Sequence, residues 1–144
     1  MTVTFCGHST IYSEDLDIVK QRLYEEIKRA ILCGAEEFLF GGYGEFDLLC
    51  ARAVKEIKKK YPNIKSVLVV PYIDEGYNKE LYDCSEYPPI ENVPKRFAII
   101  KRNEYMVEIS DVVIAYVKYS TGGAYRTYSS AVRKGKNVIN LFSE

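Results

Sequence analysis

Three glycine-bearing loops carry the residues best suited to bind a small anionic ligand. They are Gly7-His8-Ser9-Thr10, Gly41-Gly42-Tyr43-Gly44-Glu45 and Lys118-Tyr119-Ser120-Thr121-Gly122-Gly123. Glycine lets a ligand approach the backbone closely, and free N–H groups at the start of a helix bind phosphate. Ser120 and Thr121 add hydroxyl donors. The alternative is that the glycines only form tight turns between strands and helices.

Two carboxylates, Glu45 and Asp47, flank Phe46 directly after the second loop. Beside a bound nucleotide, a carboxylate binds ribose hydroxyls. It also serves as nucleophile, or stabilises an oxocarbenium-like carbon, when an N-glycosidic bond breaks. Glu45 is the preferred catalytic candidate. Negative charge in the first turn of a helix is also favourable in itself, so a purely structural role stays open for both.

His8 and Arg126 are the other candidates beside these loops. His8 is the only histidine of the chain. It either hydrogen-bonds a phosphate, acts as a general acid near neutral pH, or packs over the sheet edge. Arg126 follows the third loop and either contacts an anion or forms a surface ion pair.

Short apolar segments alternate with amphipathic ones along the chain. The apolar runs predict strands at residues 3–6, 38–40, 64–70, 112–116 and 138–141. Apolar steps of three or four residues predict helices over 15–32, 46–60, 95–109 and 124–134. Pro88, Pro89 and Pro94 exclude a continuous helix, so residues 72–94 are expected to be irregular, either as a lid or as a surface excursion.

This alternation predicts an α/β fold, a single Rossmann-like three-layer sandwich over residues 1–144. Right-handed crossovers give a mostly parallel five-stranded sheet with the order 3-2-1-4-5. In this arrangement the first and fourth strands are central neighbours, and ligands bind beyond their carboxyl ends. The three glycine loops are therefore expected to meet at one edge of the sheet.

Composition excludes several classes of protein. The 144 residues carry 20 basic and 20 acidic side chains, so nucleic acid is an unlikely partner on charge alone. No segment is expected to enter a membrane and no signal peptide is expected. The four cysteines include no CxxC pair, so no metal site is expected, and free thiols indicate a cytoplasmic protein. Dinucleotide and P-loop fingerprints are lacking, and no cofactor is expected.

An ordered set of motifs from Val3 to Leu141 resembles the SLOG superfamily, and most closely its YpsA-like branch. Related groups are the Lonely Guy phosphoribohydrolases and the Rossmann-like domains of DprA. The matching segments are Phe5–His8, Phe38–Asp47, Val70-Pro71-Tyr72, Arg102–Met106 with Ser110-Asp111, and Ser120–Gly123.

The resemblance implies a nucleotide or nucleotide-like ligand, with its phosphate near the helix after the second Gly-Gly pair. It implies that the site is lined by Gly7, Gly41, Gly42, Gly44, Gly122 and Gly123. Pro71 belongs to one of the matching motifs, and Tyr43 adds a ring beside the loops that is able to stack on a base. Arg102 matches an arginine that the Lonely Guy enzymes use in catalysis.

The Lonely Guy enzymes also carry a PGGxGTxxE motif. The corresponding residues 121–129 of this chain are TGGAYRTYS, so the proline, third glycine, threonine and glutamate of the motif are replaced. The main expectation is therefore binding or sensing of a nucleotide-derived ligand. The alternative is a small N-glycosidase or phosphoribohydrolase-like enzyme that uses Glu45 and Arg102, so enzymatic activity stays open. A homodimer is a further expectation.

Overall fold

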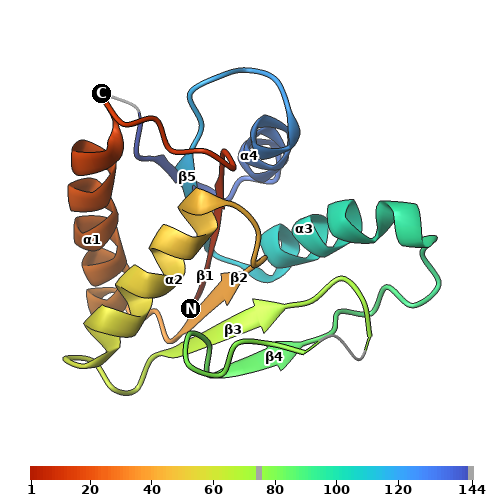
Figure 1. Ribbon diagram of the computed structural model, residues 1–144, viewed down its shortest axis with the longest axis horizontal. Helices are drawn as coiled ribbons and strands as arrows, with labels where there is room; N and C mark the ends of the chain where they lie inside the picture. The colour runs from red at the N-terminus through yellow and green to blue at the C-terminus, as the bar shows by residue number, and fades with distance from the viewer. Residues whose placement is uncertain (74–75, 143–144) are drawn as a thin grey trace.

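The computed structural model describes residues 1–73 and 76–142 and shows a parallel sheet between two helical layers (Figure 1). The strands are β1 (Thr2–Gly7), β2 (Glu37–Phe40), β3 (Lys65–Val69), β4 (Cys84–Glu86), β5 (Val112–Tyr116) and β6 (Asn137–Asn140). Their order is β4-β3-β2-β1-β5-β6, and each neighbouring pair is parallel. β1 and β5 are central neighbours, with Gly7 beside Tyr116.

Four α-helices cover the sheet in two pairs. They are α1 (Leu16–Leu32), α2 (Glu45–Lys58), α3 (Ala98–Ile109), which follows the 3-10 turn η1 (Lys95–Phe97), and α4 (Gly123–Arg133). α1 packs on α2, and α3 packs on α4. The two pairs lie on opposite faces (Figure 1), as right-handed crossovers on the two sides of β1 require. None of the helices in the described ranges is long and apolar enough to cross a membrane.

Buried apolar side chains fill both interfaces between sheet and helices. On the α1–α2 side, the rings of Phe5 and Phe40 stack with centroids 5.0 Å apart. α1 contributes the buried residues Val19, Leu23, Ile27 and Ala30 at steps of three or four, which explains why this segment forms a helix against the sheet. On the other side, Met106 of α3 packs among buried residues of β2 and β3.

The structure confirms the predicted fold class and the central strand order, with one addition to the sheet. Residues 72–94 were expected to be irregular, but Cys84–Glu86 forms the edge strand β4 beside β3. The side chain of Asp83 docks this strand, because its Oδ2 accepts a hydrogen bond from the Ser66 backbone N–H at 2.8 Å. β4 has three residues and none is β-branched, so it lacks the pattern that identifies a strand in a sequence.

Candidate functional site

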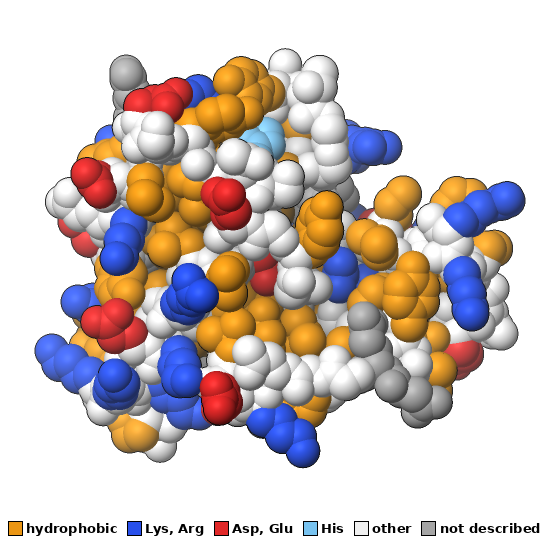
Figure 2. All heavy atoms as spheres, viewed as in Figure 1, with side chains coloured by type: hydrophobic (Ala, Val, Ile, Leu, Met, Phe, Trp, Pro, Cys, Tyr) orange, Lys and Arg blue, Asp and Glu red, His pale blue; other side chains and the backbone are white. Residues whose placement is uncertain are grey.

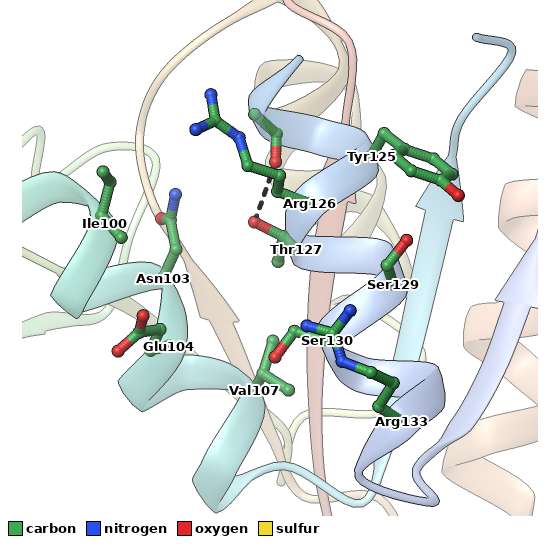
Figure 3. Close-up of a pocket in the computed structure, with 11 residues that line it drawn as sticks. Ile100, Asn103, Glu104, Val107, Tyr125, Arg126, Thr127, Ser129, Ser130 and Arg133 are labelled. Atoms are coloured by element: carbon green, nitrogen blue, oxygen red, sulfur yellow. Dashed lines mark hydrogen bonds between the residues drawn. The ribbon is translucent and has the colours of Figure 1, made fainter. Parts of the chain in front are cut away.

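The carboxyl ends of β1 and β2 border a small hollow that lies next to a larger groove. The hollow, of about 90 Å³ and here called the β1 hollow, is lined by Gly7, Gly41, Arg102 and neighbouring residues. The α3–α4 groove, of about 390 Å³, runs between those two helices (Figure 3). The two cavities share Asn103, Val107, Gly123 and Thr127. The two cavities therefore adjoin each other beside the predicted switch point of the sheet.

The start of α4 lies where the hollow meets the groove. Gly122 caps the helix with a φ of 92°, a conformation that favours glycine. No side chain caps this end, and the first N–H groups of a helix have no partner within it. The positions of a Cβ on Gly122 and on Gly123 meet no atom within 4 Å. The backbone here is open to an anion, and Arg126 lines the groove one turn further along α4.

The side chain of Asp47 binds the backbone N–H groups of the turn that follows β2, so these groups are not free to bind a ligand. Its two carboxylate oxygens accept hydrogen bonds from the N–H groups of Gly41, at 3.2 Å, and Gly42, at 2.8 Å. Burial raises the pKa of Asp47 to about 6, although these hydrogen bonds and the charge of Arg102 act to lower the pKa. The Gly41-Gly42 turn is therefore already occupied by a carboxylate of the chain itself, whereas the start of α4 is not.

Arg102 is buried, with 4% of its surface exposed. Its Nη1 donates hydrogen bonds to the carbonyl oxygens of Gly41, at 2.8 Å, and Val69, at 2.9 Å, and thereby joins the ends of β2 and β3. A Cβ on Gly41 would lie 3.3 Å from the Arg102 guanidinium carbon. Arg102 thus has a structural role at the floor of the β1 hollow as well as a place in its lining.

Glu45 lies on a different side of the second loop from Arg102. Its carboxylate accepts a hydrogen bond from the Ile11 N–H at 2.8 Å, and its own N–H donates to the Ser9 carbonyl oxygen at 2.8 Å. Glu45 lines a third cavity with Ser9, Gly42, Gly44 and Tyr82, whereas Arg102 lines the β1 hollow. The two residues expected to share a catalytic role therefore face different cavities, and Asp47 and Tyr43 border both.

His8 links the loops that follow β1 and β5. Its Nε2 accepts hydrogen bonds from the backbone N–H groups of Lys118, at 2.8 Å, and Tyr119, at 3.3 Å. Partial burial lowers the pKa of His8, and an Nε2 that accepts hydrogen bonds is unprotonated. These contacts favour the packing role over that of a general acid.

A polar network beneath the third loop was not predicted from the sequence. The Tyr116 hydroxyl donates to Asp15 Oδ2 at 2.7 Å, and Lys118 Nζ pairs with the same oxygen at 3.1 Å. The Lys118 ammonium also lies over the ring of Tyr12, 4.8 Å from its centroid. The Tyr116 hydroxyl and Lys118 lower the pKa of Asp15. This network fixes the loop that leads into α4.

The remaining predicted residues divide between the rim and the surface. Tyr43 is 80% exposed and borders the β1 hollow. Pro71 is half-buried, and Ser9, Ser120 and Thr121 are exposed. Among the described residues, Pro71, Ser120 and Thr121 are not in the lining of the hollow or the groove.

Sequence reasoning missed the residues of α3 and α4 that form the walls of the groove. They are Ile100, Asn103, Glu104, Val107, Thr127, Ser129, Ser130 and Arg133. A signal was present, because Arg126, Ser130 and Arg133 recur at steps of four and three and so share a face of a helix.

A parallel sheet between two helical layers defines a Rossmann-like α/β domain, and here a cavity lies at the carboxyl edge of the sheet. The family model described as the YspA SLOG family (YpsA) matches residues 10–140, and the chain belongs to this family. UPF0398 proteins of Bacillus cereus (strain Q1) and Bacillus thuringiensis (strain Al Hakam) are each 23% identical to it over 142 residues, which is 89% of this chain and 76% of the relative.

Two solved structures share the fold. DNA processing protein A (DprA) from Streptococcus pneumoniae superposes with a TM-score of 0.64 at 21% identity, over 95% of this chain and 48% of that one. A structure of DprA from Helicobacter pylori, described by its unique single-stranded DNA binding mode, gives a TM-score of 0.62 at 18% identity, over 96% and 63%. The chain thus spans about half the length of the first DprA.

This comparison corrects one expectation from the sequence. The net charge of zero predicts that nucleic acid is an unlikely partner, and that prediction is wrong for this fold. The same fold occurs in a protein described by its binding of single-stranded DNA. The error was to use the charge of the whole chain, because nucleic-acid binding depends on where basic side chains gather.

Proposed function

We propose that this protein binds a phosphate-bearing, nucleotide-type ligand in the β1 hollow and the α3–α4 groove. The observation that carries the proposal is the open start of α4 between the two cavities, with Arg126 beside it. Free N–H groups, the helix dipole and a guanidinium together favour a phosphate. The hydroxyl and amide groups of Thr127 and Asn103 supply polar partners for a sugar or a base.

Calorimetry with a panel of nucleotides tests this proposal. The panel contains nucleoside mono-, di- and triphosphates, ADP-ribose and cyclic nucleotides. We expect at least one compound to bind, and Arg126→Ala to weaken its binding at least fivefold. The matched control is Arg52→Ala, which removes the same charge from an exposed position on α2. Absence of binding across the panel, or equal affinity of Arg126→Ala and the wild type, would contradict the proposal.

Single-stranded nucleic acid is the second candidate, favoured by the surface at the start of α3. Here Lys95, Arg96 and Lys101 lie beside exposed Phe97 and Ile99. The Arg96 guanidinium lies 4.9 Å from the centroid of the Phe97 ring. Figure 2 shows basic and hydrophobic side chains together at the end of the molecule where Figure 1 places this turn. Proteins bind single-stranded nucleic acid through basic groups that contact the phosphates and through rings that stack on the bases.

Fluorescence polarisation with a labelled single-stranded oligonucleotide tests the second candidate. Binding that weakens as salt rises, and that Arg96→Ala reduces several-fold while Arg52→Ala does not, supports it. Absence of salt-sensitive binding at low ionic strength excludes it. Cleavage of an N-glycosidic bond has less support, because Glu45 and Arg102 line different cavities.

A further inference from the structure

Two arginines, Arg126 and Arg133, line the same groove two turns apart on α4. Seven residues of α-helix separate their Cα atoms by about 10 Å along the axis. In Figure 3 both side chains extend from α4 toward α3, with Arg126 at the upper end of the groove and Arg133 toward its lower end. Within the described ranges, neither guanidinium takes part in an ion pair. Each is available to a ligand.

The wall of α3 opposite these arginines carries an acceptor. Glu104 lines the groove and forms an ion pair with Lys101 at 3.2 Å. Figure 3 shows its carboxylate at about the level of the Arg133 guanidinium, with the Asn103 amide between that level and the guanidinium of Arg126. A carboxylate repels a phosphate but accepts hydrogen bonds from sugar hydroxyls or base amino groups. Along the groove, the side chains therefore favour an anion beside Arg126, then a group that hydrogen-bonds to the Asn103 amide, then a second anion at Arg133, where Lys101 offsets the charge of Glu104.

We infer that the α3–α4 groove binds a nucleotide-type ligand in which a nucleoside separates two phosphate groups. This inference rests on the proposed function and specifies its ligand. The phosphates of a diphosphate share a bridging oxygen, so they bind as one unit beside Arg126. Phosphates on the 3′ and 5′ oxygens flank the ribose, so one binds at the start of α4 and the other reaches Arg133. The ribose and base then lie beside Asn103, and Glu104 accepts hydrogen bonds from their hydroxyl or amino groups.

The test compares ligands that have the same number of phosphates. Wild-type protein is titrated by calorimetry with the 3′,5′-bisphosphates, 5′-diphosphates and 5′-monophosphates of the four common nucleosides. We expect one bisphosphate to bind at least fivefold more tightly than the diphosphate of the same nucleoside. Arg133→Ala removes this preference and weakens the binding of the monophosphate less than Arg126→Ala does. Arg126→Ala weakens the binding of all three, and Arg52→Ala is the control for charge.

The outcomes separate this inference from the proposed function. If the monophosphate binds in an Arg126-dependent manner but the bisphosphate binds no more tightly than the diphosphate, the inference fails and the proposed function stands. A bisphosphate preference that survives in Arg133→Ala also overturns the inference. If none of these compounds binds the wild type, both this inference and nucleotide binding in the groove are contradicted. Thermal unfolding of each variant establishes that the fold is retained.

Discussion

Asp47 and Arg102 hold Gly41 through its two backbone groups. Asp47 accepts a hydrogen bond from the Gly41 N–H at 3.2 Å, and Arg102 donates one to the Gly41 carbonyl oxygen at 2.8 Å. Both side chains also line the β1 hollow. The same two residues therefore shape the turn after β2 and present opposite charges to the candidate site.

Replacing Arg102 with Met is expected to destabilise the fold. The buried carbonyl oxygen of Val69 and the partly buried one of Gly41 would lose a charged donor, which costs about 1–3 kcal/mol for a buried group left unsatisfied. We expect the free energy of unfolding, measured with urea, to fall by about 2 kcal/mol or more. Arg52→Met, at an exposed position on α2, is expected to change it by less than about 0.5 kcal/mol. Equal stability of the two variants would show that Arg102 is not a structural link.

The ionisation of Asp47 is expected to make anion binding depend on pH. Its pKa is about 6, above the ordinary 3.8, so the carboxyl is charged above pH 6 and becomes neutral below it. A neutral Asp47 no longer repels a phosphate, so affinity is expected to rise as the pH falls through 6. Calorimetry with a nucleotide between pH 5 and 7.5 measures this rise.

Asp47→Asn separates this effect from the titration of the ligand, whose phosphate also gains a proton near pH 6. The variant is expected to flatten the part of the pH dependence that comes from the protein. If Asp47→Asn and the wild type show the same profile, Asp47 does not face the bound anion.

Replacing Gly7 with alanine is expected to lower the stability of the fold, whereas replacing Gly123 with alanine is expected to weaken nucleotide binding. A Cβ on Gly7 would lie 2.3 Å from Phe46 Cδ2, whereas a Cβ on Gly123 meets nothing within 4 Å. Gly7→Ala therefore forces Phe46 to move and is expected to cost about 1–3 kcal/mol of stability. Gly123→Ala is expected to retain stability and to weaken nucleotide binding, because the methyl group enters the space beside the start of α4. Thermal unfolding and calorimetry distinguish the two effects, and full affinity in Gly123→Ala would place the ligand elsewhere.

His8 is expected to make stability depend on pH. Its pKa is lowered in the fold, so the unfolded chain binds the proton more readily and the stabilisation present above the ordinary value of 6.5 is lost as the pH falls. His8→Gln keeps an acceptor but does not titrate. Melting temperatures from pH 7.5 to 5 are expected to fall less steeply for His8→Gln than for the wild type, and parallel slopes would contradict this.

The sequence was sufficient for the order of the central strands, because hydrophobic periodicity and the handedness of crossovers depend on local patterns. β4 was missed because Cys84-Ser85-Glu86 pairs through its backbone and carries no strand pattern. The contacts of Asp47, Arg102 and His8 were also missed, since each joins segments far apart in the chain. Spacing alone does not indicate that a carboxylate occupies the N–H groups of Gly41 and Gly42.

The central claim is that a nucleotide phosphate binds at the start of α4. The most direct measurement is a nitrogen–proton NMR titration of labelled protein with the tightest-binding compound of the nucleotide panel. The account predicts that the largest shifts fall on the amides of Gly123, Ala124 and Tyr125, with smaller ones on Asn103 of α3. Shifts confined to the cavity of Glu45 and Tyr82, or no shifts at saturating nucleotide, would contradict it.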